Sequence, residues 1–314
     1  MKVWIDTDGG VDDALALACA YADPAIELAG ITTVFGNVAP RKAARNAALV
    51  QSFFDPPHVS ISVGAVAPLV GSWRDARIIH GEDGLGGASS GHLLGYEAGH
   101  VQEDGPEASA ARLAGFAREA GAGGAIICLG PVTNLAIALR HHPDAFAALG
   151  QVVCMGGVFT IPVSRRHTAG EFNFGSDLEA VRGLLAAAPN LTIVPLDTCR
   201  KVVLRRARLA RIAGTSEAPL ARFLQRAHNH YMNAYRASDG IDGCFPHDAL
   251  AVAALAHPGI FRFETRSLEL DSSSGFAGLL RTGGQGRPVR VAVDTDQRAA
   301  LDWIEACICR HAPH

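Results

Sequence analysis

Four carboxylates lie within the eight residues D-T-D-G-G-V-D-D at positions 6–13. Like charges at such short range repel one another, so a bound cation is the least costly way to hold them together. The apolar run V-W-I at 3–5 predicts a buried strand, the two glycines predict a tight turn, and Asp12 and Asp13 open an apolar stretch that predicts a helix. The N-terminus of that helix adds partial positive charge. Because ligands of open α/β sheets bind beyond the carboxyl ends of strands, the position favours a cation site over a solvated acidic turn.

Polar blocks also follow the other predicted strands. They are Asn37, H-G-E-D-G-L-G-G at 80–87, L-G-P-V-T-N at 129–134, M-G-G at 155–157, E-F-N at 171–173 and H-D at 247–248. The carboxyl ends of parallel strands meet at one edge of a sheet, so we expect these groups to lie close together. Carboxylate, amide and carbonyl oxygens, without a cluster of thiolates, favour Ca²⁺ or Mg²⁺ over Zn²⁺.

The elements that must position these residues alternate between strand and helix patterns. Strands are predicted over 2–6, 26–34, 59–63, 125–129, 151–155, 191–196, 266–270 and 289–293. Helices are predicted over 12–22, 40–52, 108–120, 133–141, 176–188, 217–237, 246–257 and 296–311. The stretches 71–105 and 156–175 are predicted to be irregular, functional loops, and the Gly/Ser-rich segment 272–287 a surface hairpin. The order predicts one α/β domain over residues 1–314, with a Rossmann-like, mostly parallel sheet flanked by helices on both faces.

Composition narrows the classes of partner and compartment. The 314 residues are 48% hydrophobic, which is ample for a large core. The formal net charge of -3 gives no electrostatic reason to expect nucleic acid or an anionic membrane as a partner. We find no apolar run long enough to cross a bilayer and no secretory signal pattern, so we expect no membrane association. The seven cysteines form no C-x-x-C pair, which favours a reducing, cytoplasmic setting. The basic run at 205–208 predicts a solvated face.

The motifs resemble those of the inosine–uridine type nucleoside hydrolases, and they follow that family's order along the whole chain. The block at 6–13 is the most specific, and it is joined by G-N at 36–37, L-G-P-V-T-N-L-A at 129–136 and the blocks at 80–87, 155–157, 171–173 and 247–248. The resemblance implies an enzyme of nucleoside salvage that hydrolyses the N-glycosidic bond of a ribonucleoside to ribose and a free nucleobase. It also implies a small-molecule ribonucleoside as partner and assembly into a homodimer or homotetramer.

The resemblance implies a bound Ca²⁺ as cofactor. Its ligands would be Asp8, both carboxylate oxygens of Asp13, the main-chain carbonyl of Leu129 and Asp248, completed by two ribose hydroxyls and one water. Such a mixed set of oxygens suits Ca²⁺, which tolerates loose geometry. Because adjacent helical residues point in different directions, Asp13 can face the metal while Asp12 faces the ribose 2′-hydroxyl.

The resemblance also assigns roles in catalysis and substrate binding. Asp8 would be the general base that takes a proton from water, and His247 the acid that serves the leaving base. The implied substrate-binding residues are Asp12, Asn37, Asn173 beside the 2′-hydroxyl, Glu171 toward the 5′-hydroxyl, Phe172 against the sugar, Met155 on the pocket floor, and His80, Tyr231 and Tyr235 near the base. Plainer roles stay open for some of these residues. His247 could be a brace beside the metal ligand, Tyr231 and Tyr235 could be core aromatics, and Asp6 is expected to brace the loop.

One stretch departs from the family pattern. Residues 158–170, V-F-T-I-P-V-S-R-R-H-T-A-G, are longer than is usual and lack the Asn that helps to read the 5′-hydroxyl in the family. Arg165, Arg166 and His167 stand where small polar residues are common. Two interpretations follow: the enzyme accepts a 5′-modified or larger nucleoside, or the insertion is a surface loop and another group reads the 5′-hydroxyl. The preference between purine and pyrimidine nucleosides is also left open.

Two other functions compete with this interpretation. A haloacid-dehalogenase-like, Mg²⁺-dependent phosphatase also ends its first strand in Asp-x-Asp. That class expects Thr or Val where this chain has Gly10, and it leaves Asp12, Asp13 and the E-F-N block at 171–173 unexplained. The second alternative is a non-catalytic nucleoside- or ribose-binding protein on the same scaffold. The presence of every implied catalytic carboxylate argues against it.

Overall fold

A ten-stranded sheet runs through the protein, with strand order β11-β10-β12-β7-β6-β5-β1-β2-β3-β4. The computed structural model describes residues 1–54, 59–90, 101–161, 170–271, 273–283 and 286–310. The strands of this sheet are β1 (Lys2–Thr7), β2 (Glu27–Thr33), β3 (Ile61–Val63), β4 (Val101–Gln102), β5 (Gly124–Cys128), β6 (Gln151–Met155), β7 (Leu191–Val194), β10 (Phe261–Leu270), β11 (Leu280–Thr282) and β12 (Pro288–Thr295). A separate two-stranded sheet joins β8 (Leu204–Arg205) and β9 (Gly243–Cys244).

The order in which strands are added to the sheet reverses at β1. From β1 the chain adds β2, β3 and β4 toward one edge, and it then returns to place β5, β6 and β7 on the other side of β1. All the neighbouring pairs from β12 to β4 are parallel. The loops that follow β1 and β5 therefore diverge, and a crevice opens at this switch point beyond the carboxyl ends of the strands.

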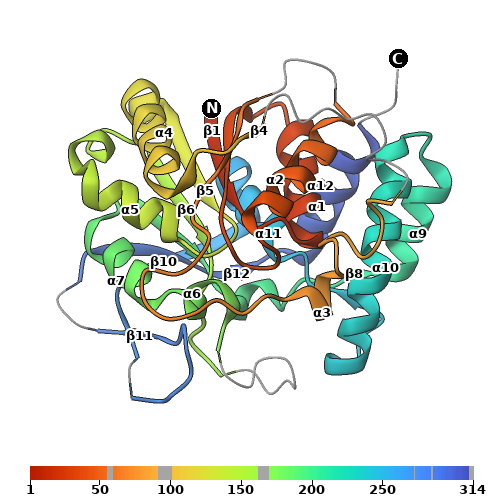
Figure 1. Ribbon diagram of the computed structural model, residues 1–314. Coiled ribbons are helices and arrows are strands. Elements are labelled where there is room, and N and C mark those ends of the chain that lie inside the picture. The colour runs from red at the N-terminus through yellow and green to blue at the C-terminus, as the bar shows by residue number, and fades with distance from the viewer. Residues whose placement is uncertain (55–58, 91–100, 162–169, 272, 284–285, 311–314) are drawn as a thin grey trace.

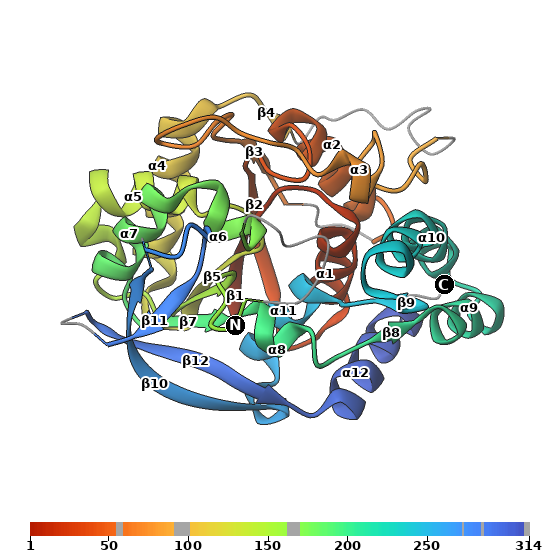
Figure 2. The same ribbon diagram turned by 90° about the horizontal axis from the view of Figure 1, so that it is seen from below.

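Helices cover both faces of the sheet (Figure 1, Figure 2). The α-helices are α1 (Val11–Ala22), α2 (Pro40–Gln51), α3 (Arg77–His80), α4 (Gly105–Ala120), α5 (Thr133–His141), α6 (Phe172–Ser176), α7 (Leu178–Ala187), α8 (Leu196–Cys199), α9 (Arg206–Thr215), α10 (Pro219–Asp239), α11 (His247–Ala256) and α12 (Gln297–Cys309). Three short 3₁₀ helices are η1 (Gly121–Gly123), η2 (Pro143–Phe146) and η3 (Pro258–Ile260). One buried core packs α1, α2, α10, α11 and α12 against the sheet, and a second packs α4, α5 and α7 against its other face.

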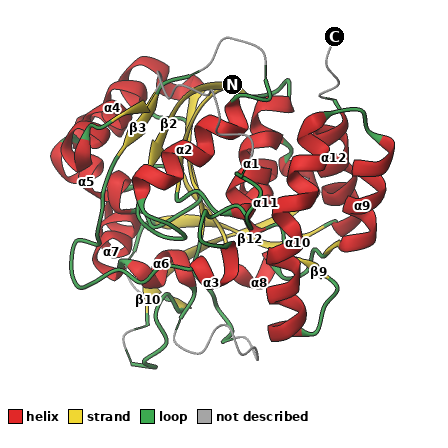
Figure 3. Cartoon of the chain, turned by 45° about the vertical axis from the view of Figure 1, so that its right-hand side comes forward, coloured by secondary structure: helices red, strands yellow, loops and turns green. Residues whose placement is uncertain are grey.

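The turn from β1 into α1 depends on close packing against α2. Gly9 has φ +74°, a conformation that disfavours a side chain, and a Cβ there would lie 2.4 Å from Cα of Ala43. Val3 and Ile5 are fully buried in β1, and every α1 residue from Val11 to Ala20 is buried. The acidic loop is therefore held between a buried strand and a buried helix. Figure 3 shows the helices that surround the sheet.

The predicted fold class is confirmed, including the mostly parallel sheet and the helices on both faces. The exception is β10, which is antiparallel to both β11 and β12. Of the segment 272–287, predicted to be a surface hairpin, β11 pairs with β10, and Phe276, Leu279 and Leu280 are buried rather than at the surface. The segment 71–105 holds α3 and β4, and α6 begins at Phe172 inside 156–175, so neither stretch is wholly irregular. Helix α9 was not predicted. Its residue Arg208 donates to Glu305 and Asp302 of α12, so the prediction of a solvated basic face is wrong there.

Candidate active site

A cavity of about 410 Å³ opens at the switch point of the sheet. Twelve of the residues singled out from sequence line it: Asp12, Asn37, His80, Leu129, Met155, Glu171, Phe172, Asn173, Tyr231, Tyr235, His247 and Asp248. Asp8 and Asp13 lie beneath this lining with no exposed surface. The motifs that follow different strands therefore meet at one place, as the parallel order predicts.

Asp13 is fixed by donors on both of its carboxylate oxygens. The hydroxyl of Thr7 and the backbone N–H of Asp8 donate to Oδ1, the latter at 3.2 Å. The backbone N–H of Gly10 donates to Oδ2 at 2.8 Å, and the amide of Asn37 donates to the same oxygen at 3.2 Å. These four donors orient the carboxylate, and each offsets part of its charge.

Asn37 holds the carboxylate of Asp8 from the neighbouring strand end. Its backbone N–H donates to Oδ2 of Asp8 at 2.9 Å, and its side-chain amide donates to Oδ1 at 2.7 Å. The NH₂ group of Asn37 therefore serves Asp8 and Asp13, which leaves its amide oxygen as the atom available to a ligand. This bracing role was not foreseen for a residue predicted to contact ribose.

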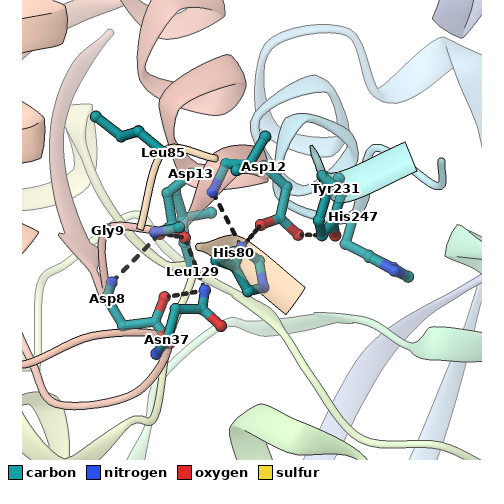
Figure 4. Close-up of polar contacts among 12 residues, drawn as sticks. Asp8, Gly9, Asp12, Asp13, Asn37, His80, Leu85, Leu129, Tyr231 and His247 are labelled. Atoms are coloured by element: carbon teal, nitrogen blue, oxygen red, sulfur yellow. Dashed lines mark hydrogen bonds and ion pairs between the residues drawn. The ribbon is translucent and has the colours of Figure 1, made fainter. Parts of the chain in front are cut away.

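Asp12 points away from Asp13 and reaches between two aromatic residues (Figure 4). Its Oδ2 accepts a hydrogen bond from the hydroxyl of Tyr231 at 3.0 Å. Its Oδ1 lies 3.7 Å from Nδ1 of His80, and that nitrogen accepts the backbone N–H of Val11 at 3.1 Å. Since Nδ1 of His80 is an acceptor, the proton of the neutral ring sits on Nε2. Asp12 thus contacts the base side of the cavity while Asp13 is bonded within its own loop, and the ribose role of Asp12 stays a prediction.

The carboxylates form a group that suits a hard cation. One oxygen from each of Asp12, Asp13 and Asp248 lies within 4.8 Å of the other two. Burial, followed by the charges of neighbouring aspartates, raises the pKa of Asp8 and of Asp248 well above the usual range of carboxyl groups. Such a desolvated cluster of oxygens is unfavourable when ionised unless a positive charge neutralises it. The donor set therefore fits a metal ion of the Ca²⁺ or Mg²⁺ type.

Asp6 lies behind this group and contacts protein rather than the cavity. Its Oδ1 accepts hydrogen bonds from Thr32 at 2.6 Å and from the amide of Asn134 at 2.8 Å. Burial raises the pKa of Asp6 to about 7. The residue ties β1 to β2 and to the start of α5, consistent with the bracing role predicted for it.

His247 and the two tyrosines form a connected chain at the other side of the cavity. The hydroxyl of Tyr235 lies 2.7 Å from Nε2 of His247 and 3.4 Å from the hydroxyl of Tyr231. All three side chains are buried, and Tyr231 and Tyr235 come from one face of α10, as their spacing predicts. These polar contacts connect His247 to Asp12 through Tyr235 and Tyr231. The tyrosines therefore make hydrogen bonds as well as pack in the core.

Asn173 and Glu171 shape the remaining wall. The amide of Asn173 donates to the main-chain oxygens of Leu129 at 2.6 Å and Met155 at 3.0 Å. The carboxylate of Glu171 caps α6 by accepting the N–H groups of Asn173 and Phe174, and it also accepts that of Gly157. Burial raises the pKa of Glu171 despite these three bonds.

The ends of the unusual loop 158–170 are anchored next to this wall. Val158 pairs with Leu279, and Gly170 pairs with Ala277. The carboxylate of Asp197 accepts the backbone N–H groups of Phe159 at 2.8 Å and Thr160 at 2.9 Å. Arg165, Arg166 and His167, on which the two interpretations of this loop depend, lie outside the described residues.

Some lining and supporting residues were missed from sequence. Asp75, Ala76, Ile78, Ile79, Gly170 and Leu196 also line the cavity. Asn46 of α2 donates to the main-chain oxygens of Gly9 at 2.8 Å and Asp83 at 2.9 Å, and thus joins the acidic loop to the loop of His80. The signal for Asn46 was available: it is an amide on the buried, alanine-rich face of an amphipathic helix.

The whole chain agrees with one family of enzymes. The family model for the inosine-uridine preferring nucleoside hydrolase matches residues 3–302. The chain belongs to this family. It is 29% identical over 318 residues to uridine nucleosidase 1 of Arabidopsis thaliana, with 97% of this chain and 92% of that protein covered. It is 27% identical over 311 residues to the non-specific ribonucleoside hydrolase RihC of Salmonella agona, with 97% and 96% covered.

Solved structures of nucleoside hydrolases share the fold. The purine-preferring ribonucleoside hydrolase from Gardnerella vaginalis superposes with a TM-score of 0.87 at 25% identity, covering 99% of each chain. The plant nucleoside hydrolase PpNRh1 superposes with a TM-score of 0.86, also at 25% identity and 99% coverage. The protein is therefore an N-glycosyl hydrolase of ribonucleosides, and neither the phosphatase nor the non-catalytic binding protein is favoured.

Within the part of the chain that the structure describes, none of the helices has the length and apolar character needed to cross a membrane.

Proposed function

We propose that the protein hydrolyses ribonucleosides with Ca²⁺ as its cofactor. The observation that carries this proposal is the convergence of Asp12, Asp13 and Asp248 at one end of the cavity, Asp13 lying beneath its lining, with Leu129, Asn173 and Glu171 on the wall. Asp8, Asp13, the carbonyl of Leu129 and Asp248 would hold the ion. When bound, Ca²⁺ supplies a positive charge that balances the buried carboxylates and acidifies a neighbouring water.

The residues of the chain would then divide the reaction between them. Asp8 takes a proton from the attacking water as general base, and Asn37 keeps its carboxylate in place through two hydrogen bonds. The water attacks the anomeric carbon as the bond to the base breaks, through a transition state with oxocarbenium character. His247, backed by Tyr235 at 2.7 Å, donates a proton to the departing base.

The ribose and base would occupy opposite sides of the cavity. Asp12 and Asn173 face the 2′-hydroxyl, Glu171 faces the 5′-hydroxyl, Phe172 packs on the sugar and Met155 forms the floor. Asn37 offers its amide oxygen to the sugar, while His80, Tyr231 and Tyr235 surround the base. A wall of buried hydrogen-bonding groups rejects a sugar that lacks hydroxyls, because those groups would be left unpaired.

Substitution of Asp8 tests the central step. In Asp8→Ala, release of reducing sugar from nucleosides in the presence of Ca²⁺ should be abolished, while nucleoside binding measured by calorimetry is only weakened. Full turnover in this variant would remove Asp8 from the mechanism. If the unmodified protein cleaves no nucleoside with Ca²⁺ present, the proposal as a whole fails.

Uridine is the first substrate to test, because uridine nucleosidases are among the relatives with similarity along nearly the whole chain. A panel of uridine, cytidine and inosine, each at equal concentration, would rank the bases by kcat/KM. Comparison of uridine with 5′-deoxyuridine tests the loop at 158–170. A large loss without the 5′-hydroxyl would contradict the idea that this enzyme takes 5′-modified nucleosides.

We further propose a homodimer or homotetramer in the cytoplasm. Val66 and Val70 are 64% and 73% exposed on one short segment, which supports an interface with a second copy. All seven cysteines are free thiols, a state that reducing compartments maintain. Sedimentation velocity on the purified protein would test the assembly, and a Val70→Asp variant should shift it toward the monomer.

A further inference from the structure

Arg200, which directly follows α8, contacts both ends of the segment that joins α10 to α11. Its Nη2 donates to Oδ1 of Asp239, the last residue of α10, at 2.8 Å. Its guanidinium lies over the ring of Phe245, 4.7 Å from the centroid, two residues before His247. The side chains of Arg200 and Asp239 are only 23% and 3% exposed, so this ion pair is largely removed from water and is weakly screened.

Phe245 packs in turn against Tyr235 and His247, the pair proposed to face the leaving base. Its ring is perpendicular to that of Tyr235, with centroids 5.3 Å apart, and lies 5.8 Å from the imidazole of His247. Edge-to-face packing of this kind fixes ring orientation, and the guanidinium over the ring of Phe245 adds to it. The same element gives a second support, because the thiol of Cys199 contacts the carbonyl oxygen of His247 at 3.8 Å.

We propose that Arg200 is a positioning residue for the Tyr235–His247 pair, acting through Phe245. Neither Arg200 nor Phe245 lines the cavity, so neither can touch the substrate directly. The inference rests on the proposed function, in which His247 serves the departing base. Loss of Arg200 frees the ring of Phe245 and displaces the imidazole from the base, while the carboxylates and the sugar-binding wall keep their places. Small misplacements of a reacting group cost large factors in rate.

Two substrates with different leaving groups test the proposal. Uridine needs help for its base to depart, whereas p-nitrophenyl β-D-ribofuranoside releases a stable nitrophenolate anion without it. We expect Arg200→Ala to lower kcat for uridine by about tenfold and to change kcat for the nitrophenyl riboside by less than about twofold. KM for uridine should stay nearly constant. Arg200→Lys keeps the charge beside Asp239 but loses the planar face, so it should recover part of the loss.

Arg206 provides the matched control. It donates to Asp242 at 2.9 Å and to Asn229 and Asn233, so it ties the same segment to α10 by other contacts. We expect Arg206→Ala to retain turnover of both substrates. An equal loss on the two substrates in Arg200→Ala, or the same selective loss in Arg206→Ala, would overturn the proposal. If the unmodified protein cleaves neither substrate, the proposed function fails instead.

Phe245→Leu separates positioning from a folding defect. This variant should reproduce the selective loss on uridine, and Arg200→Ala should add nothing to it, because the two residues act in series. Additive losses would show that Arg200 acts without Phe245 and would contradict the proposal. Melting temperatures of all variants identify any that fail to fold, in which case Arg200→Lys and Phe245→Leu decide the outcome.

Discussion

The hydroxyl of Tyr231 donates a hydrogen bond to Oδ2 of Asp12 at 3.0 Å, which joins two helices across 219 positions of the sequence. The other oxygen of Asp12 lies 3.7 Å from His80, and the rings of His80 and Tyr231 are 4.9 Å apart. A carboxylate assigned to the sugar is therefore oriented by residues assigned to the base. Under the proposed roles, this arrangement would couple recognition of the two halves of a nucleoside.

Removal of this hydroxyl should weaken recognition of the 2′-hydroxyl. We expect Tyr231→Phe to lower kcat/KM for uridine about tenfold, because Asp12 loses the donor that sets its rotamer. The loss on 2′-deoxyuridine should be smaller, since that substrate lacks the group that Asp12 is proposed to contact. Steady-state kinetics on both substrates measure the difference. Equal losses would separate Tyr231 from the sugar.

Metal binding should raise the stability of the protein through Asp13. We expect added Ca²⁺ to raise the melting temperature, with a gain of about 2.7 kcal/mol at a hundredfold excess over Kd. Asp13→Asn should abolish the rise, because it places an NH₂ group among the N–H and O–H donors that surround the carboxylate. Asp242→Asn, which alters an exposed ion pair, should retain the full rise. A rise of equal size in Asp13→Asn would place the ion elsewhere.

The grouping of the site residues could be predicted because the sequence shows where the strands end. The carboxylates after β1, Leu129 after β5 and the histidine and aspartate that open α11 each follow a recognisable pattern, and a parallel sheet brings such positions to one edge. A prediction of the class of ion rests on the residue types alone. These patterns do not show which side chains hydrogen-bond to one another within the site.

The supporting contacts could not be predicted because they join segments that are distant in the chain. The NH₂ group of Asn37 donates to Asp8, and Arg200, which directly follows the four-residue helix α8, contacts the ring of Phe245. Helix α9 was missed because only Leu209, Ile212 and Ala213 are buried in it, and arginines occupy much of the rest. Its position is set by ion pairs with α12, which no local pattern reveals.

Asn46 should prove important to the geometry of both site loops. Its amide donates to the carbonyl oxygens of Gly9, which is buried, and Asp83, which is partly buried, so Asn46→Ala leaves both acceptors without this donor and should cost about 2 kcal/mol of unfolding free energy. Asn46→Asp has the same shape but turns an acceptor toward both carbonyls, so it should be the more damaging change. Urea denaturation measures the two variants. Equal stability of Asn46→Ala and the unmodified protein would contradict this role.

His228 should make the protein less stable in acid. The residue is fully buried on α10, its Nδ1–H donates to the carbonyl oxygen of Leu224 at 2.7 Å, and burial lowers its pKa from 6.5 to about 4. The ring is therefore neutral in the fold, whereas the unfolded chain takes up a proton near pH 6.5. The stability that the neutral ring provides is complete above that pH and is lost as the pH falls toward 4, by about 3 kcal/mol in total.

A variant that cannot titrate isolates this contribution from those of the buried carboxylates. We expect the unfolding free energy of His228→Leu to fall less than that of the unmodified protein between pH 7 and pH 4, with the gap approaching about 3 kcal/mol. His230→Gln, two positions away on the exposed side of the same helix, should follow the unmodified protein. Parallel pH profiles for His228→Leu and the unmodified protein would mean that the fold accepts a charge at this buried position.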